Sequence, residues 1–376
     1  MKILFVAESP SWVDHHIAGS LRAMGHEVVR YRYGTHVGEF YGRARAGERM
    51  RKNDELLQLA TSQARDGLDL IFCYVYDDFL LPEHARKLAA LGVPLVNFNV
   101  DMVNQWYRQS RTARFFTRVL CAQKANMRQL ARYGAKVLYF PMAAPLPAND
   151  GDDGWRPAAP VTFVGTPMPF RLRVLGELHR AGVPLAVYGK WWREQRQALP
   201  DRNREKLVSD IVHYGWPRLR AEGVGAMANA LRQRLRPTQS PALDPLPDSV
   251  LHGFVPDGRM QALFRHSRIN LGFSRMSGDD PAVPGINQVK LRDFEVPMAG
   301  GFYLMEHAPD YDELFVPGRE VETWRTLDEL NDKLRYYLDH PAQCAAIAQA
   351  GARRARAEHS WQHRFAQLFT ELGLRG

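Results

Sequence analysis

Short apolar runs alternate with segments of helical periodicity along the first 140 residues. Continuous apolar runs are typical of strands that are buried on both faces of a parallel sheet. These runs span residues 2–7, 27–31, 68–74, 94–99, 118–122 and 136–140. Segments of helical period lie between them, at 14–24, 82–91 and 124–133. Gly25 and Gly92 each follow such a segment, as a left-handed helix cap would. The alternation predicts a parallel, doubly wound sheet.

The same pattern starts again at residue 161, after a change in composition. Residues 141–160, PMAAPLPANDGDDGWRPAAP, are dense in Pro, Gly, Asp and Ala, which is typical of an interdomain linker. The second series predicts strands and helices in alternation. The strands are at 161–165, 185–189, 250–254, 269–273 and 302–305, and the helices at 171–180, 256–265 and 289–299, before the terminal helices.

A length of 376 residues favours two domains over one. We therefore predict an α/β protein with two Rossmann-like doubly wound domains that face each other across a cleft. The expected domains are 1–145 and 161–355, joined by a linker at 146–160. Basic helical segments and a Pro-rich stretch interrupt the second domain, so we expect an insertion at about 191–248. Open parallel sheets bind ligands at the carboxyl ends of their strands, which is where the chemistry is expected.

Composition excludes several classes of protein. The 45% apolar and 24% charged residues are those of an ordinary globular chain. No apolar run is long enough to span a bilayer, and the start MKILFVAESP becomes polar too early for a signal peptide, so a cytoplasmic location is expected. Cys73, Cys121 and Cys344 are far apart and show no metal-ligand spacing, so neither a disulfide framework nor a zinc site is expected.

The formal charge of +9 leaves open affinity for anionic substrates, lipid head groups or nucleic acid. The 50 Lys and Arg residues are spread along the chain, so no nucleic-acid partner is expected, while peripheral contact with a membrane remains open. Trp191 and Trp192, with Arg193 and Arg196, form an aromatic and cationic cluster. Packing of the inserted segment is the preferred interpretation of this cluster, ahead of nucleic-acid binding.

The segment 277–315 carries the richest candidate chemistry. A loop with Gly and Pro leads into the predicted helix that carries Lys290, Arg292 and Glu295. Amides at a helix N-terminus and a basic side chain can bind phosphate oxygens, and a carboxylate can accept hydrogen bonds from two ribose hydroxyls. Alternatively, Arg292 and Glu295 pair with each other on one helix face. Lys290 and Arg292 can reach one diphosphate only if the helix begins between them.

Candidates for a general base lie in the first half of the chain. His15 and His16 follow the first strand, where an imidazole could deprotonate an acceptor hydroxyl. Their neighbour Asp14 could cap the first helix. Asp101 follows the strand 94–99 and is a rival base, or else a cap for the helix that contains residues 106 and 107. The aromatic pair at 106 and 107 could stack on a sugar, although core packing is preferred.

Three stretches of the second half resemble a known family. They are VTFVGTPMPFRLRVLGELHRAGVPLAVYG at 161–189, HGFVPDGRMQALFRHSRINLGFS at 252–274, and the stretch that begins RDFEVPMAGGFYLMEHAPDYDELF at 292. In order and spacing they are similar to the C-terminal half of bacterial glycosyltransferases of the GT-B fold, and most of all to the CgeB-like group, which is named for a spore-maturation protein. The first half matches only in general style.

The resemblance implies transfer of a sugar from a nucleoside-diphosphate sugar to a hydroxyl acceptor, with no metal and no other cofactor. It implies that Glu295 binds the donor ribose and that Arg292 and Lys290 lie near the diphosphate. Gly165 matches the turn that passes close to the nucleotide, and Arg171 is a weaker phosphate candidate. In this fold the last helix, within 356–376, often crosses back to the N-terminal domain.

The chain departs from the family at one position of the donor segment. Many retaining enzymes of this fold carry Glu-x7-Glu, but the residue eight positions before Glu295 is Asn287. The first acid is either missing or supplied by Asp279 or Asp280, so the stereochemical outcome stays open. The alternative function is that of a non-catalytic protein that keeps the fold and binds a nucleotide or a glycan.

Overall fold

The computed structural model describes residues 1–8, 12–34, 45–100, 106–147, 154–193, 219, 223–224, 246–277 and 286–374. The chain divides into two compact units. The described elements of the first lie in Met1–Pro141 and Trp361–Gly376, and those of the second in Met142–Asp201 and Thr238–Ser360. Most of the insertion expected at 191–248 lies outside the described residues, as do Asp101, Asp279 and Asp280.

Six parallel strands form the sheet of the first unit, in the order β2-β1-β3-β4-β5-β6. They are β1 (Lys2–Ala7), β2 (Glu27–Arg32), β3 (Leu70–Cys73), β4 (Leu95–Asn99), β5 (Arg118–Cys121) and β6 (Val137–Tyr139). The apolar runs of β1 and β3 are buried on both faces, as such runs in a parallel sheet require. The strand order reverses between β1 and β3, so the carboxyl ends of these two strands are the expected ligand edge.

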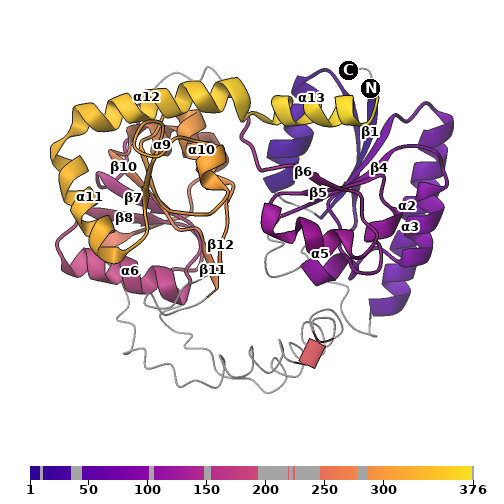
Figure 1. Cartoon of the computed structure of the whole chain (residues 1–376), viewed down its shortest axis with the longest axis horizontal. Coiled ribbons are helices and arrows are strands. Elements are labelled where there is room, and N and C mark those ends of the chain that lie inside the picture. Colours follow the sequence, from indigo (N-terminus) through magenta and orange to yellow (C-terminus); the bar gives the residue numbers. More distant parts are fainter. Residues whose placement is uncertain are drawn as a thin grey trace. The chain divides into compact units, whose positions relative to one another are not determined.

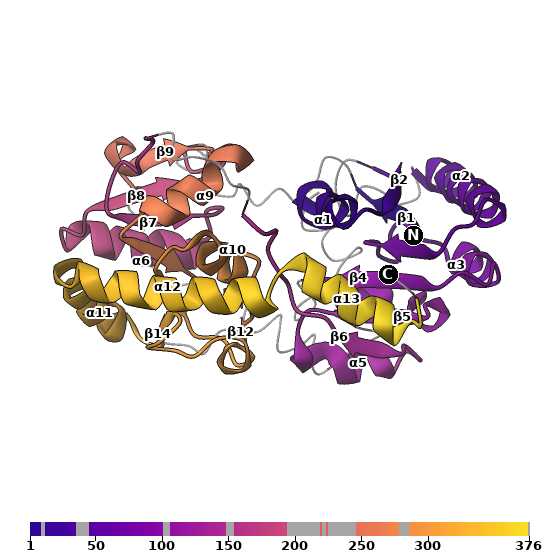
Figure 2. The same ribbon diagram turned by 90° about the horizontal axis from the view of Figure 1, so that it is seen from above.

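Helices cover both faces of this sheet. They are η1 (Asp14–Ala18, a π-helix), α1 (Gly19–Ala23), α2 (Ala46–Arg65), α3 (Pro82–Ala89), α5 (Met127–Ala131), α13 (Trp361–Glu371) and the 3-10 turns η3 (Trp106–Gln109), η4 (Ala113–Phe115) and η5 (Lys124–Asn126). Helices α1 and α13 share one face, and α2 and α3 share the other (Figures 1 and 2). Trp361 and Phe365 of α13 pack on Phe98 and Phe72 of the sheet, so the end of the chain completes this core.

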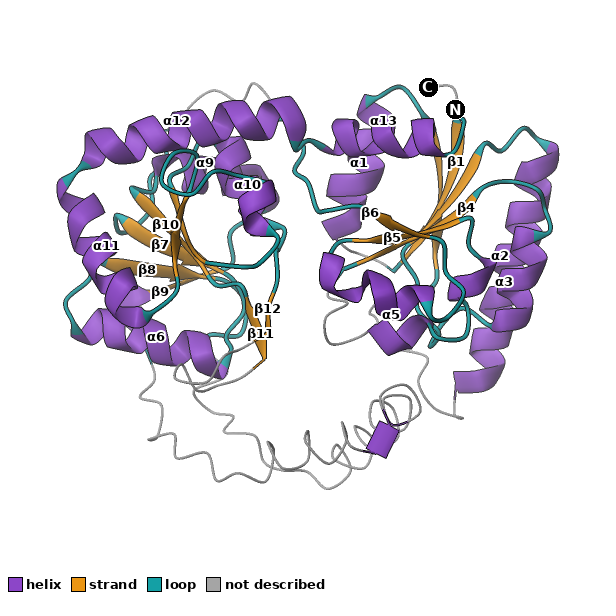
Figure 3. Ribbon diagram, in the orientation of Figure 1, coloured by secondary structure: helices purple, strands orange, loops and turns teal. Residues whose placement is uncertain are grey.

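Six further parallel strands form the sheet of the second unit, in the order β14-β13-β10-β7-β8-β9. Figure 3 shows its strands β7 to β10 with helices around them. They are β7 (Val161–Val164), β8 (Leu185–Tyr188), β9 (Leu251–Gly253), β10 (Ile269–Gly272), β13 (Tyr303–Glu306) and β14 (Glu322–Trp324). An antiparallel pair, β11 (Arg275–Ser277) and β12 (Ile286–Asn287), follows β10. Here the strand order reverses between β7 and β10.

The helices of the second unit lie on both faces of its sheet. They are α6 (Pro169–Arg180), α9 (Asp257–His266), α10 (Arg292–Ala299), α11 (Leu327–Asp339), α12 (Pro341–Glu358) and the 3-10 turns η8 (Asp248–Val250) and η9 (Tyr311–Glu313). Figure 1 shows α6 on the opposite side of the sheet from α9 and α10. Gly300 ends α10 in the left-handed region at φ 83°, and a Cβ on Gly301 would lie 2.4 Å from Phe264 O, so this glycine pair serves packing.

These sheets confirm the predicted α/β architecture with two Rossmann-like domains, and the predicted strands agree with the observed ones to within a few residues. Helix α2 was not predicted, because its buried positions include a polar residue, Asn53, and most of its remaining side chains are polar or charged. The helix expected at 289–299 begins only at Arg292. No helix in the described parts of the chain is both long and apolar enough to cross a bilayer.

Candidate functional site

Gly165 stands at the carboxyl end of β7, where the strand order of the second sheet reverses. Its amide bonds Tyr188 O (3.0 Å) and its carbonyl accepts from Trp192 Nε1 (2.8 Å), so the turn is held on both sides. A Cβ here would lie 2.7 Å from Phe163 Cζ and 3.2 Å from Arg171 Nη1. Only glycine fits without displacing these side chains, which leaves the backbone of the turn open to close approach by a ligand.

Arg171 lies in the first turn of α6, beside Gly165. Its Nη1 donates to Thr166 O (2.8 Å), and its guanidinium lies 5.5 Å from the centre of the Phe163 ring. Its Nε is buried and has no partner among the described residues. Burial lowers the pKa of Arg171 to about 10. A desolvated cation with an unused donor is suited to an anionic ligand, because buried polar groups require partners.

Lys290 lies just before α10 and is turned towards the end of β10. Its Nζ donates to Phe273 O (2.7 Å) and to Arg275 O (3.0 Å). These two carbonyls follow β10, so the ammonium ties the entry of α10 to the carboxyl edge of the sheet. In this structure Lys290 therefore orients the loop, and its charge faces carbonyl oxygens.

Asp293 is a functional candidate that the sequence analysis missed. Its carboxylate accepts from Lys290 N (2.7 Å) and from the hydroxyl of Tyr303 (2.9 Å), and only 2% of the residue is exposed. The bond to Lys290 N satisfies an amide just before the helix, which explains why α10 begins later than predicted. Burial raises the pKa of Asp293 to about 6. An acidic residue in the first turn of a helix was the available signal.

Arg292 and Glu295 form an ion pair on one face of α10. The pairing is the one that their three-residue spacing allows, and the guanidinium also lies 5.4 Å from the Phe264 ring centre. The side chains are 34% and 13% exposed, so Arg292 in particular is within reach of solvent. Because α10 begins at Arg292, the helix starts between Lys290 and Arg292, the condition under which both could serve one diphosphate.

Asn287 occupies the position of the absent acid. Its Nδ2 donates to His307 O (2.9 Å), and its Oδ1 is buried with no partner in the described parts of the chain. The neighbouring acid is Glu306, whose carboxylate accepts from Arg275 N (3.0 Å) and Arg275 Nε (3.3 Å). Arg275 also stacks on Phe170 at 4.1 Å. This buried ion pair at the carboxyl ends of β10 and β13 was not predicted, because its partners are 31 residues apart.

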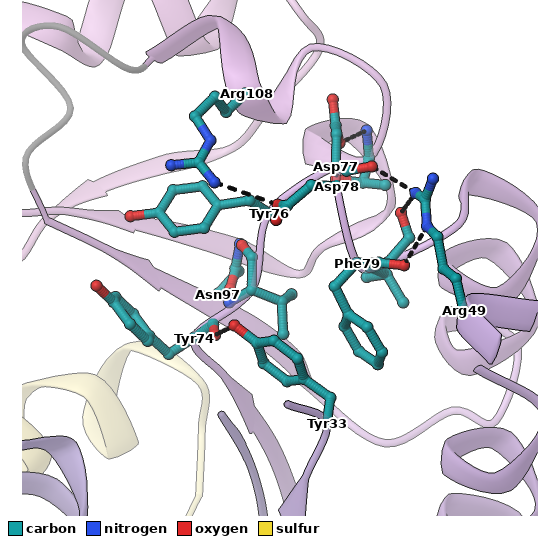
Figure 4. A network of polar contacts seen from close by, with 12 residues as sticks. Tyr33, Arg49, Tyr74, Tyr76, Asp77, Asp78, Phe79, Asn97 and Arg108 are labelled. Atoms are coloured by element: carbon teal, nitrogen blue, oxygen red, sulfur yellow. Dashed lines mark hydrogen bonds and ion pairs between the residues drawn. The ribbon is translucent and has the colours of Figure 1, made fainter. Parts of the chain in front are cut away.

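The corresponding edge of the first sheet carries a polar network after β3 (Figure 4). Asp77 accepts from Thr112 Oγ1 (2.6 Å) and Arg111 N (2.8 Å), and burial raises its pKa to about 6. Asp78 pairs with Arg108 (3.3 Å), and both are almost fully buried. No signal from spacing identified these two acids, since their partners come from the segment after β4.

Backbone contacts hold the same loop in place. Asn97 bonds both the amide and the carbonyl of Val75, at 3.0 and 2.9 Å, and Arg49 Nε donates to Phe79 O (2.8 Å). The hydroxyl of Tyr33 donates to Tyr74 O (3.3 Å) (Figure 4). Hydrogen bonds from several elements therefore hold this loop, which is largely buried, at the point where the strand order of the first sheet reverses.

The base candidates of the first unit have different surroundings. His16 is 5% exposed, and its Nδ1 accepts from Trp361 Nε1 at 3.3 Å, so its ring is part of the packing of α13. His15 is exposed. Asp14 does not cap a helix but pairs with Arg30 at 2.6 Å. Asp101 lies outside the described residues.

Comparisons with known proteins connect this geometry to a family. A family model described as "Glycosyl transferase-like" matches residues 171–370. No curated protein matches the sequence. Among solved structures, Anabaena HepE in complex with UDP-glucose is 12% identical over 99% of both chains, with a TM-score of 0.58. Sucrose-phosphate synthase from Thermosynechococcus elongatus is 12% identical over 99% of both chains, with a TM-score of 0.57.

A glycosyltransferase from Rickettsia africae gives a TM-score of 0.57 at 10% identity, over 98% of this chain and 97% of its own. At such identities the likeness shows the fold, and it extends over both units. The family match covers more than half of the chain and includes Arg171 and α10. The chain therefore belongs to the glycosyl transferase-like family and is a glycosyltransferase of the GT-B fold.

Proposed function

We propose that the chain transfers a sugar from a nucleoside-diphosphate sugar, UDP-linked in the first instance, to a hydroxyl group. The observation that supports this most directly concerns Arg171. Its guanidinium is largely buried beside the Gly165 turn, and its Nε has no hydrogen-bond partner among the described residues. This pair stands where the strand order reverses, the general ligand position of open parallel sheets. The UDP-glucose bound by HepE supports the choice of nucleotide.

In this proposal the donor diphosphate binds at the Gly165 turn and Arg171, with the N-terminus of α10 nearby. Helix N-termini favour phosphate because their amides and dipole point at it. Lys290 holds the loop between β10 and α10 through Phe273 O and Arg275 O. As the sugar departs, negative charge builds up on the diphosphate, and preorganised cations stabilise that charge.

Glu295 binds the ribose in this proposal, in exchange for its present partner. Two vicinal hydroxyls donate to one carboxylate, which releases the Arg292 guanidinium towards the diphosphate. The exchange keeps every charged group paired in both states.

The acceptor hydroxyl attacks the anomeric carbon, its proton goes to a base, and the nucleoside diphosphate leaves without a metal ion. Asp101, His15 and His16 are our candidates for that base on the first unit, with exposed His15 the more accessible of the two histidines. The side chain of Asn287 is an amide and not a carboxylic acid, so we assign it a structural role, in which its Nδ2 donates a hydrogen bond to His307 O. We further propose membership of the CgeB-like group, action in the cytoplasm and peripheral contact with membranes.

Calorimetry with UDP, GDP and TDP tests the donor site. Hydrolysis of the corresponding nucleotide sugars in the presence of EDTA tests whether turnover occurs without a metal ion. We expect binding of UDP and slow release of sugar that EDTA does not abolish. If a nucleotide binds but no sugar is released or transferred with any acceptor that is tried, the non-catalytic alternative is favoured. Failure to bind any of the three nucleotides would overturn the proposed site.

A further inference from the structure

Acidic residues are absent from one long stretch in the first half of the chain. Residues 102–149 contain six Arg and two Lys but no Asp or Glu. The rest of the chain therefore holds 42 Lys and Arg against 41 Asp and Glu, a net charge of only +1. The Lys and Arg residues are spread along the chain, but the excess behind the net charge of +9 comes almost wholly from this stretch. A local excess of one sign attracts an oppositely charged partner to one part of the surface.

Four of these cations are exposed on neighbouring elements at one edge of the first sheet. They are Arg114 in η4, Arg128 in α5, Arg132 at the end of α5, and Lys136 just before the edge strand β6. Figure 2 shows α5 beside β6. A Cβ on Gly134 would lie 3.3 Å from the Cβ of Arg114, so the turn between α5 and β6 packs on η4. The four cations therefore belong to one continuous surface, which we call the basic face.

The basic face differs from the other cations of the same stretch, which have partners. These partners are Asp78 for Arg108 (3.3 Å), Asp77 for the amide of Arg111 (2.8 Å), Glu371 for Arg118 (2.8 Å) and the Tyr139 ring for Lys124 (4.9 Å). No acidic side chain among the described residues lies within ion-pair distance of a cation of the basic face. Its charges are therefore available to an external anion.

Folding alone gives no reason for this arrangement. Arg128 and Arg132 are four residues apart, and Arg132 N bonds Arg128 O (3.2 Å), so the two guanidinium groups lie on the same side of α5. Like charges at this spacing destabilise a helix. The end of α5 is nevertheless fixed, because the Tyr133 ring stacks on Trp106 with their centres 5.7 Å apart. The cations are thus held close together on an ordered surface, and an anionic partner would turn their repulsion into attraction.

The side chains around these cations indicate which partner fits. Ala125, Ala131 and Gly134 are exposed, and no large apolar side chain is exposed in residues 106–141, all of which the structure describes. Stacking on nucleic-acid bases needs an exposed aromatic ring, and insertion among acyl chains needs an exposed apolar side chain. The basic face has neither, so its attraction is electrostatic. A bilayer with anionic head groups offers a plane of negative charge, and each Lys or Arg near it strengthens binding roughly fivefold.

We propose that the basic face docks the protein on membranes whose head groups are anionic. The inference rests on the peripheral membrane contact proposed above, and it names the surface and the lipid chemistry of that contact. It uses no residue of the donor site, so the binding of vesicles and the binding of UDP succeed or fail separately. Because the attraction is electrostatic, binding should require anionic lipid and should be reversed by salt.

The test is co-sedimentation of the full chain with vesicles of phosphatidylcholine, either pure or mixed with phosphatidylglycerol. The wild type should bind only the mixed vesicles, and a rise from about 0.1 M to about 1 M salt, which shortens the Debye length from about 10 Å to about 3 Å, should release it. The double variant Arg128→Gln/Arg132→Gln should bind the mixed vesicles roughly 25-fold more weakly. Arg22→Gln/Arg86→Gln is the matched control, because it removes two exposed cations from α1 and α3 of the same unit.

Melting temperature and UDP affinity separate docking from folding and from donor binding. The Arg128/Arg132 variant should melt no lower than the wild type, because it removes a like-charge pair from α5, and it should keep its affinity for UDP. Failure of the wild type to bind mixed vesicles, binding to pure phosphatidylcholine, or equal loss of binding in the two double variants would overturn the proposal. Tighter binding to a duplex oligonucleotide than to mixed vesicles would assign the surface to nucleic acid and overturn it as well. Vesicle binding that depends on Arg128 and Arg132 in a chain that binds no nucleotide would support the basic face and refute the proposed donor site.

Discussion

Replacing Arg171 by methionine separates its role in ligand binding from any role in stability. Burial lowers its pKa from 12.5 to about 10, which corresponds to about 3.5 kcal/mol against the charged form at about 1.4 kcal/mol per pKa unit. The bond to Thr166 O at 2.8 Å returns roughly 1.5–3 kcal/mol, and the contact with Phe163 about 0.5 kcal/mol. These contributions cancel to within about 1.5 kcal/mol. Arg171→Met should therefore leave the free energy of unfolding nearly unchanged.

Donor affinity should respond very differently to the same change. One charge-assisted hydrogen bond to phosphate is worth about 1.5–3 kcal/mol, so Arg171→Met should weaken UDP binding roughly 10- to 150-fold. Calorimetry measures the affinity, and differential scanning fluorimetry the melting temperature. Arg180→Met is the control, because Arg180 is exposed at the other end of α6 and its loss makes the same change in net charge.

The opposite pattern of results would contradict a ligand-binding role for Arg171. A fall in melting temperature of more than about 8 °C with unchanged UDP affinity would show that Arg171 serves the turn at Thr166 and not a ligand. Equal loss of affinity in the Arg180 variant would instead attribute the effect to net charge.

Three further changes test other parts of the two sites. In calorimetry, Glu295→Gln should weaken the binding of UDP about tenfold but leave the binding of 2′,3′-dideoxy-UDP unchanged, because only the ribose hydroxyls need the carboxylate. Equal weakening of both nucleotides would show that Glu295 does not bind the ribose. Burial raises the pKa of Asp293 from 3.8 to about 6, so its charged form destabilises the folded chain at pH 7, and the wild type should gain stability as the pH falls through 6 towards 4. Asp293→Asn should lack this gain in thermal melts, and parallel pH profiles would contradict the assignment. Asp78→Ala removes the carboxylate 3.3 Å from Arg108 and leaves a buried charge without that partner. In urea titrations it should lower the free energy of unfolding by about 3–5 kcal/mol, whereas a loss below about 1 kcal/mol would mean that the pair is dispensable.

The strands were predictable from the sequence because a strand that is buried on both faces needs a continuous apolar run. The run at 2–7 became β1 with the same bounds. Gly25 and Gly92 adopt positive φ, at 85° and 76°, but the C-caps of α1 and α3 are Met24 and Ala90, which precede them. Helix α2 escaped prediction because its buried stripe is narrow and includes Asn53. Asn53 is stabilised there by bonds to Phe79 O and Leu81 N, from a loop that is distant in sequence.

The sequence alone also singled out residues 277–315 as the proposed donor segment, since glycine, basic and acidic residues recur there in an order that resembles the family. It did not determine what each side chain binds. Lys290 bonds two carbonyls after β10, Asp293 meets Tyr303 from the next strand, and Arg275 meets Glu306 across the sheet. Those pairs depend on the order of the strands, which no local pattern encodes.

Tertiary structure likewise decided which of two adjacent tryptophans is buried and which is exposed. The residues are chemically identical, and their neighbours in sequence favour neither fate. Contacts of the loop with Gly165 and Gly253, which come from other strands, direct Trp192 inwards and leave Trp191 exposed in a strained conformation. Periodicity along the chain determines which segments form strands and helices, because it depends on near neighbours. Burial, strain and unused hydrogen-bonding capacity arise only where distant segments meet, and those are the properties that make a site.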